Sequence, residues 1–125
     1  MSGKTFILDT NIIIYLSQEK MKMTDFASKG DRLCISIISY MESLGHPFIN
    51  NEETIVKSLC DACEVFNLTR QITEKTIEIR KQTKIKLPDA IIAASALVNK
   101  AVLVTANVKD FKMIDWISII NPLQD

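Results

Sequence analysis

The sequence predicts an α/β fold in which helices cover both faces of a central parallel β-sheet. Segments with strand character alternate with segments of helical periodicity along the 125 residues. The strand segments are continuous runs of β-branched residues and leucine, which are typical of strands buried on both faces. No linker, repeat or low-complexity stretch interrupts the chain. We therefore expect a single domain over residues 1–125.

The elements follow from apolar periodicity and from the residues that start and stop helices. Strands are expected at residues 5–8, 33–36, 64–68, 101–104 and 118–120. Helices are expected at residues 11–16, 23–29, 39–44, 52–61, 69–84, 88–99 and 109–112. Gly30 and Gly45 are expected to end two of these helices, Ser39 to cap one, and Pro88 to occupy a first turn.

Composition limits the class of protein. The 15 basic and 15 acidic side chains balance, which argues against a general charge-driven nucleic-acid binder but not against a nucleic-acid enzyme. Three cysteines (Cys34, Cys60 and Cys63) are interpreted as reduced residues in apolar surroundings, and no second pair completes a zinc site. No signal peptide is visible and no apolar run reaches the ~20 residues of a membrane span. These features predict a cytoplasmic protein.

Three acidic residues occupy corresponding places along the chain. Asp9 directly follows the first strand, Glu42 lies on the helix after the second, and Asp110 follows the strand at 101–104. Because ligands on parallel sheets gather at the carboxyl ends of the strands, we expect these three side chains to face one rim.

Asp89 reaches the same rim by a different argument. The helical face that begins at Asp89 continues through apolar residues at offsets of three, four, seven and eight. These residues are Ile92, Ala93, Ala96 and Leu97. The face must point to the core, and its alanines allow close approach to the sheet. Asp89 is therefore expected to lie at the top of a buried face.

Each acidic residue also has an ordinary explanation. Asp9 could cap a helix, Asp89 could interact with a helix dipole, Glu42 could be solvated, and Asp110 could belong to a turn. Together, however, carboxylates about 4 Å apart would repel by about 4 kcal/mol at an effective dielectric of about 20. A divalent cation removes that repulsion. Because all the candidate ligands are oxygens, Mg²⁺ or Mn²⁺ is expected rather than Zn²⁺ or copper.

Neutral polar and basic residues accompany the acids. Thr10, Asn11, Thr105 and Asn107 could position a carboxylate or a metal-bound water, or could simply suit strand ends and turns. Lys84, Lys86, Lys109 and Lys112 flank the later acidic positions and are candidate RNA contacts, although solvated surface lysine is the more common role for each.

Four segments in this order, FILDTNIIIYL, SYMESLG, KLPDAIIAASAL and LVTANVKDF, resemble the PIN domain, and more narrowly the VapC-type toxins of toxin–antitoxin pairs. The resemblance implies an α/β/α sandwich, metal-dependent ribonuclease activity, a homodimer and a small antitoxin that binds across the acidic cleft. It places the acidic positions of the family on Asp9, Glu42, Asp89 and Asp110. Asn107 departs from the pattern, because many relatives have Asp there.

The resulting hypothesis is hydrolysis of RNA phosphodiester bonds, with Asp9 and Asp89 coordinating Mg²⁺ most directly. Glu42 would orient or deprotonate the attacking water, and Asp110 would act through water. Two alternatives remain. A catalytically inactive PIN-like module could bind RNA or protein, and an aspartyl-phosphate enzyme would need an acid where Asn11 stands. His46 is interpreted as an ordinary loop residue.

Overall fold

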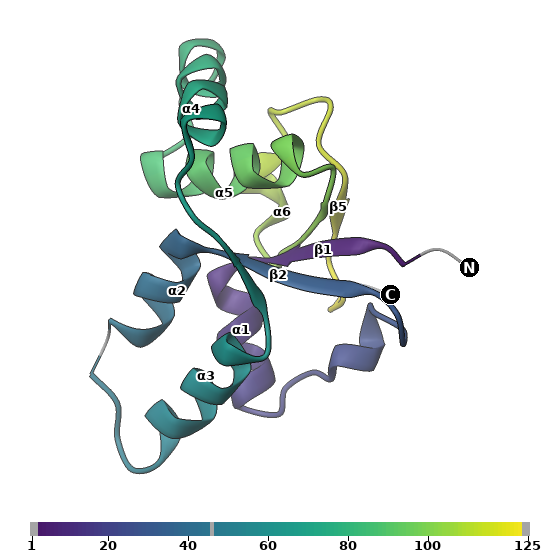
Figure 1. Ribbon diagram of the computed structural model, residues 1–125, viewed down its shortest axis with the longest axis vertical. Helices are drawn as coiled ribbons and strands as arrows, with labels where there is room; N and C mark the ends of the chain where they lie inside the picture. Colours follow the sequence, from purple (N-terminus) through teal and green to yellow (C-terminus); the bar gives the residue numbers. More distant parts are fainter. Residues whose placement is uncertain (1–2, 46, 124–125) are drawn as a thin grey trace.

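The computed structural model describes residues 3–45 and 47–123, so His46 lies outside the described residues. Within these ranges, five strands form one parallel sheet in the order β3-β2-β1-β4-β5 (Figure 1). The strands are β1 (Thr5–Leu8), β2 (Arg32–Ser36), β3 (Glu64–Phe66), β4 (Val102–Val104) and β5 (Ile119–Ile120). The order reverses at β1, whose neighbours β2 and β4 both run parallel to it. The predicted parallel sheet is confirmed.

Helices lie on both sides of this sheet (Figure 1). Helices α1 (Thr10–Ser17), α2 (Ile37–Leu44) and α3 (Glu52–Asp61) pack together on one side. On the other side, α5 (Leu87–Val98) lies against the sheet, α4 (Arg70–Gln82) packs on α5, and the short α6 (Val108–Phe111) follows β4. The molecule is thus an α/β/α sandwich, as predicted.

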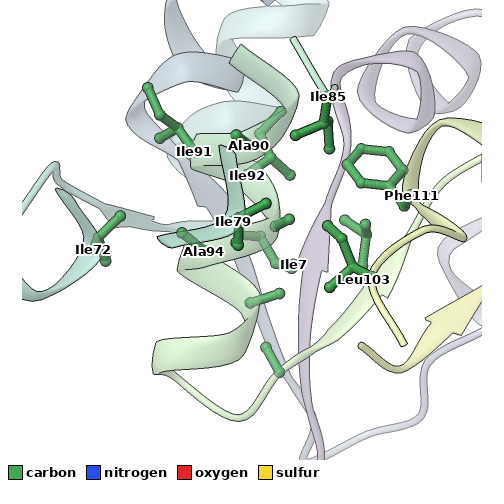
Figure 2. Packing of buried hydrophobic residues seen from close by; sticks show 14 residues of the cluster. Ile7, Ile72, Ile79, Ile85, Ala90, Ile91, Ile92, Ala94, Leu103 and Phe111 are labelled. Carbon is green, nitrogen blue, oxygen red and sulfur yellow. The ribbon is translucent and has the colours of Figure 1, made fainter. Parts of the chain in front are cut away.

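Each face of the sheet has its own apolar core, because side chains alternate along a strand. On β1, Ile7 faces one cluster, whereas Phe6 and Leu8 face the other. Figure 2 shows the first cluster, to which both Ile7 of β1 and Ile92 of α5 belong. The alanines of α5 are fully buried, so this helix approaches the sheet closely. The predicted core-facing stripe of α5 is confirmed, and it fixes where the helix begins relative to the strand ends.

Two local predictions were wrong. The helix expected at 23–29 is only a single 3-10 turn, Met23–Asp25, so Gly30 does not end a helix as predicted. The Asp31 carboxylate instead accepts hydrogen bonds from the backbone N–H groups of Ser28 (2.8 Å) and Lys4 (2.9 Å), which hold this segment as a loop beside β1. Ser39 does not cap α2. Ser36 does so by accepting from the backbone N–H of Ile38, and α2 starts at Ile37.

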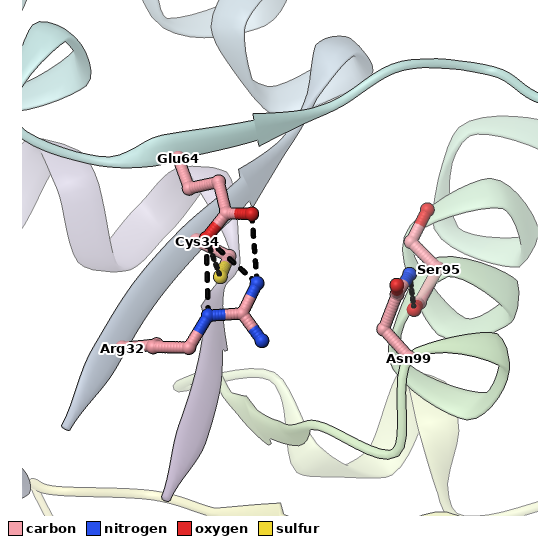
Figure 3. A network of polar contacts seen from close by, with 5 residues as sticks. All are labelled: Arg32, Cys34, Glu64, Ser95 and Asn99. Atoms are coloured by element: carbon pink, nitrogen blue, oxygen red, sulfur yellow. Dashed lines mark hydrogen bonds and ion pairs between the residues drawn. The ribbon is translucent and has the colours of Figure 1, made fainter. Parts of the chain in front are cut away.

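The edge strand β3 is joined to β2 by one exposed ion pair. Arg32 donates to Glu64 from Nε at 3.1 Å and from Nη2 at 2.7 Å (Figure 3). Both side chains are about half exposed, so the pair contributes about 1 kcal/mol or less to stability. Its effect is mainly to favour one register, in which Cys34 lies opposite Glu64.

All three cysteines are free thiols, as predicted. Burial raises the pKa of the Cys34 and Cys63 thiols to about 11, so neither is activated as a thiolate near neutral pH. Cys60 lies in the last turn of α3 rather than at a helix start, which agrees with its interpretation as a core residue. Among the described helices, none combines the length and apolar character needed to cross a membrane.

Candidate active site

The carboxyl ends of β1, β2 and β4 bring the four acidic residues to one pocket of about 420 Å³. Its lining is entirely polar: Asp9, Thr10, Asn11, Glu42, Asp89, Asn107 and Asp110. Asp9 directly follows β1, Glu42 lies on α2 after β2, and Asp110 lies on α6 after β4. Asp89 does not follow a strand; it lies in the first turn of α5, the helix that precedes β4.

Asp9 is the most buried of the four, with 5% of its surface exposed. It caps α1, because its Oδ1 accepts the backbone N–H of Thr10 at 2.8 Å. Its Oδ2 accepts from the Thr105 hydroxyl at 2.7 Å and from the Asn11 side-chain amide at 3.2 Å. Desolvation raises the pKa of Asp9, and these hydrogen bonds oppose the rise. The Asp9 carboxylate therefore caps α1 and is also held in a fixed position in the pocket by hydrogen bonds.

These contacts distinguish the two oxygens of Asp9. A carboxylate oxygen has two acceptor positions, and the two donors to Oδ2 occupy both. Oδ1 accepts only one hydrogen bond from the described residues and keeps one position free. Oδ1 is therefore the atom of Asp9 that can ligate a cation.

Asn11 and Thr105 tie the start of α1 to the segment after β4. Besides contacting Asp9, Asn11 accepts the backbone N–H of Ala106 through its Oδ1 at 3.2 Å. Thr105 is fully buried beneath the pocket, and its hydroxyl accepts the backbone N–H of Asn107 at 3.0 Å. The Thr105–Asp9 and Ala106–Asn11 bonds join residues 96 and 95 positions apart in the sequence, so the start of α1 and the segment after β4 are fixed as one unit.

Glu42 is held by a short chain of hydroxyl groups. The Thr10 hydroxyl lies 2.6 Å from Glu42 Oε1 and 3.2 Å from the Ser39 hydroxyl. Thr10 carries a single hydroxyl proton, which goes to the carboxylate, so Ser39 donates to Thr10. Sequence reasoning missed this contact of Ser39. Its position three residues before Glu42, on the same helical face, was the available signal.

The pKa of Asp89 depends on burial and on the charges of the other three carboxylates. Burial raises its pKa to about 6, with further contributions from the negative charges of Asp9, Asp110 and Glu42, while Lys86 opposes the rise. Like charges disfavour the ionised form only at short range in a partly desolvated pocket. The four acids thus form one electrostatic unit, even though no hydrogen bond joins them.

The donor set of this pocket fits a hard divalent cation. Its ligands are carboxylate and amide oxygens, which Mg²⁺ and Mn²⁺ prefer, and Asp9 presents one free acceptor position. Across residues 3–45 and 47–123, no three His, Cys, Asp or Glu side chains stand close enough to enclose an ion directly. Because Mg²⁺ keeps several waters, contact with one or two carboxylates is enough to hold it.

The candidate lysines divide into two groups. Lys84, Lys86 and Lys109 line a second pocket of about 240 Å³, which also contains Asp89 and Asp110. Lys112 is exposed and lines neither pocket. The two pockets therefore share a wall made by two of the four carboxylates.

Comparison with known proteins agrees with this geometry. The PIN domain family model matches residues 6–117, and the chain therefore belongs to the PIN domain family. Ribonuclease VapC1 of Haemophilus influenzae (strain R2866) is 35% identical over 89% of this chain and 97% of its own length. Ribonuclease VapC1 of Rickettsia felis is 27% identical over 91% of this chain and 93% of its own length.

Solved structures show the same likeness. The DNA-bound VapBC from Salmonella typhimurium superposes with a TM-score of 0.82 and 28% identity, covering 95% of this chain and 98% of that chain. VapBC-1 from nontypeable Haemophilus influenzae gives a TM-score of 0.80 at 28% identity, covering 96% of this chain and 99% of that chain. The chain is thus a homologue of VapC toxins, and the similarity extends over nearly all of its residues.

Proposed function

We propose that this protein is a metal-dependent endoribonuclease that hydrolyses RNA phosphodiester bonds as the toxin of a toxin–antitoxin pair. The observation that carries the proposal is the pocket at the carboxyl edge of the sheet, where burial, together with three neighbouring carboxylates, raises the pKa of Asp89. Because the ionised carboxylates in this pocket repel one another, binding of a divalent cation there is favourable. The VapC1 relatives, which are named ribonucleases, support the same reaction.

The contacts of each acidic residue indicate its role in the proposed reaction. Asp9 Oδ1 and the Asp89 carboxylate would hold the ion, and Asp110 would orient a water beside it. Mg²⁺ or Mn²⁺ bound there would supply Lewis acidity and would neutralise charge on the phosphate. Glu42 Oε1 is engaged by Thr10, which leaves Oε2 to orient the attacking water and accept its proton.

Cleavage assays test this function directly. We expect the purified protein to cleave single-stranded RNA in Mg²⁺ or Mn²⁺ and to lose this activity in EDTA, because the carboxylates alone cannot neutralise the phosphate. Gel analysis of an end-labelled RNA measures the rate, and re-addition of Mg²⁺ after EDTA is the control. Cleavage that continues in excess EDTA would contradict the proposal.

Thr105→Val tests whether the buried hydroxyl positions Asp9. The hydroxyl lowers the pKa of Asp9, so its loss raises that pKa further and shifts the acid limb of the pH–rate profile to higher pH. We expect activity below neutral pH to fall about tenfold or more, as for other groups that orient metal ligands. The pH dependence of kcat/KM measures this effect.

The matched control is Thr76→Val. Thr76 is also buried, at 5% exposure, but its hydroxyl bonds to the Ile72 carbonyl within α4, away from the carboxylates. An equal shift of the pH profile in both variants would mean that Thr105 acts only through general stability.

We also propose that the protein acts in the cytoplasm, as a homodimer bound by a small antitoxin until release. Three free cysteines suit a reducing compartment. The similar Salmonella and Haemophilus structures are of VapBC, and a similar Klebsiella pneumoniae structure is a toxin–antitoxin complex, which supports an antitoxin partner. Exposed apolar side chains on the helices, including Met41 and Ile77, offer surface for such contacts.

A further inference from the structure

The second pocket, lined by Lys84, Lys86 and Lys109, adjoins the carboxylate pocket without duplicating it. The two share Asp89 and Asp110, but the second adds only basic and apolar residues to them. A molecule that occupies the carboxylate pocket and extends past Asp89 and Asp110 therefore meets the three lysines next.

The protein holds the backbone that carries these lysines in place. Ile85, between Lys84 and Lys86, is 6% exposed and belongs to the core between α5 and the sheet. Its carbonyl accepts from Arg80 Nε at 3.4 Å. Lys109 lies on α6, which the fully buried Phe111 anchors to the same core. Anchored apolar neighbours thus point the three basic side chains outward from fixed positions.

The three lysines also form no ion pairs with the described residues. Lys57 and Lys75 each form an ion pair along their own helix. In contrast, no ion pair within the described part of the chain involves Lys84, Lys86 or Lys109. Lys86 does interact electrostatically with Asp89, whose pKa it lowers. Exposed ammonium groups that face a pocket and have no counter-ion can bind an anion without first breaking a bond.

Charge explains when that anion binds. With both shared carboxylates ionised, three lysines and two acids leave the second pocket with a small positive charge. A divalent cation held by Asp89 removes the negative part, after which the lysines dominate. The pocket would thus favour an anion most strongly when the neighbouring site is loaded.

We propose that this lysine pocket binds the phosphate adjacent to the scissile phosphate of a single RNA strand. The proposal rests on the proposed ribonuclease function. An RNA strand carries a phosphate at every nucleotide, so a strand with one phosphate at the carboxylates must place another beside them. This second phosphate is linked to the scissile phosphate through the strand, so it suits a pocket that shares Asp89 and Asp110 with the carboxylate pocket. Lys84, Lys86 and Lys109 would thereby set the minimum substrate length and the register of cleavage.

Removing single phosphate charges tests this proposal. In a short single-stranded RNA with one cleaved bond, each neighbouring phosphate is replaced in turn by an uncharged methylphosphonate, at saturating Mg²⁺. We expect one adjacent replacement to lower kcat/KM of the wild-type protein about tenfold or more, since it removes charge-assisted contacts. In the double variant Lys84→Ala/Lys109→Ala, the same replacement should have no further effect. Lys86 is left intact because it influences Asp89.

Salt dependence gives a second readout. Each phosphate contact to a single strand contributes about −0.7 to the slope of log affinity against log salt. The double variant should therefore lose up to about 0.7 from the slope of log kcat/KM. Lys84→Arg/Lys109→Arg should restore both effects. Lys29→Ala, an exposed lysine before β2 at the opposite edge of the sheet, should change neither.

The outcomes separate the two proposals. Absence of metal-dependent cleavage by the wild-type protein would overturn the ribonuclease function and this inference with it. Normal cleavage, with the methylphosphonate effect and salt slope unchanged in Lys84→Ala/Lys109→Ala, would overturn the lysine pocket alone. If those two remained unchanged while inhibition by an acidic peptide weakened, the pocket would be a protein contact, which also overturns the proposal.

Discussion

Asp89→Asn is expected to lower RNA cleavage in Mg²⁺ by about 100-fold or more. The change removes one negative charge from a pocket whose carboxylates act together, and it weakens the hold on the ion. Residues that merely orient metal ligands cost about 10–100-fold when lost, so a direct ligand should cost at least the upper value. Rates on a single-stranded RNA across a Mg²⁺ titration measure the effect.

Asp89 is a cleaner choice than Asp9 for this experiment. Asn at position 9 would keep the helix cap only by turning its amide NH₂ toward Asn11 and Thr105, which both donate to that oxygen at present. Three donors would then face one another in a buried place, and the protein would lose stability. No hydrogen bond within the described residues ends on the Asp89 side chain. Asp89→Asn therefore removes the negative charge without breaking a hydrogen bond of the fold.

A control of matched chemistry is Asp115→Asn. Asp115 is exposed and lines neither of the two pockets. Its substitution should leave both the rate and the Mg²⁺ dependence unchanged. Retention of wild-type activity by Asp89→Asn at low Mg²⁺ would show that this carboxylate does not hold the ion.

Asp89→Asn is also expected to stabilise the metal-free protein at pH 7.5. The folded-state pKa of Asp89 is about 6, against an ordinary value of 3.8, so the folded state binds this proton more tightly than the unfolded state does. Ionisation therefore destabilises the fold. The cost is absent below about pH 4, grows between these two pKa values, and is complete above about pH 6.

The size of this effect can be bounded. Each unit of pKa shift corresponds to about 1.4 kcal/mol, and partial exposure of Asp89 reduces the total to about 1 kcal/mol. For a domain of this size that is a rise in Tm of about 4 °C in EDTA. Thermal unfolding of both proteins from pH 4 to pH 7.5 measures it. Equal stability at pH 7.5 would mean that the four acids do not strain the fold.

Magnesium should reverse the order of stability. Binding to the folded state alone raises the free energy of unfolding by about 2.7 kcal/mol at 100 times the dissociation constant. We therefore expect Mg²⁺ to raise the Tm of the wild-type protein and to leave that of Asp89→Asn nearly unchanged. A similar rise in both proteins would place the ion elsewhere.

Local sequence signals predicted most element boundaries to within two residues, because those signals act over a few residues. Buried runs such as TFIL define strands by themselves, and Pro88 suits a first helical turn wherever the helix packs. The signals failed where a distant group decided the outcome. The loop after Met23–Asp25 is held by Asp31 and by the backbone of Lys4, which contacts Asp31 only once β1 and β2 pair.

The sequence by itself determined the fold class and the chemistry of the candidate site: parallel buried strands, oxygen ligands at their carboxyl ends, and no excess charge. Only the tertiary structure decided how those groups are used. It showed that Thr105 and Asn11 occupy Asp9 Oδ2, that Ser39 supports Glu42 through Thr10, and that Lys112, unlike the other three candidate lysines, lines neither pocket. The physical reason is that periodicity and capping are local properties, whereas hydrogen-bond partners and shared pockets depend on which distant segments the packed sheet brings together.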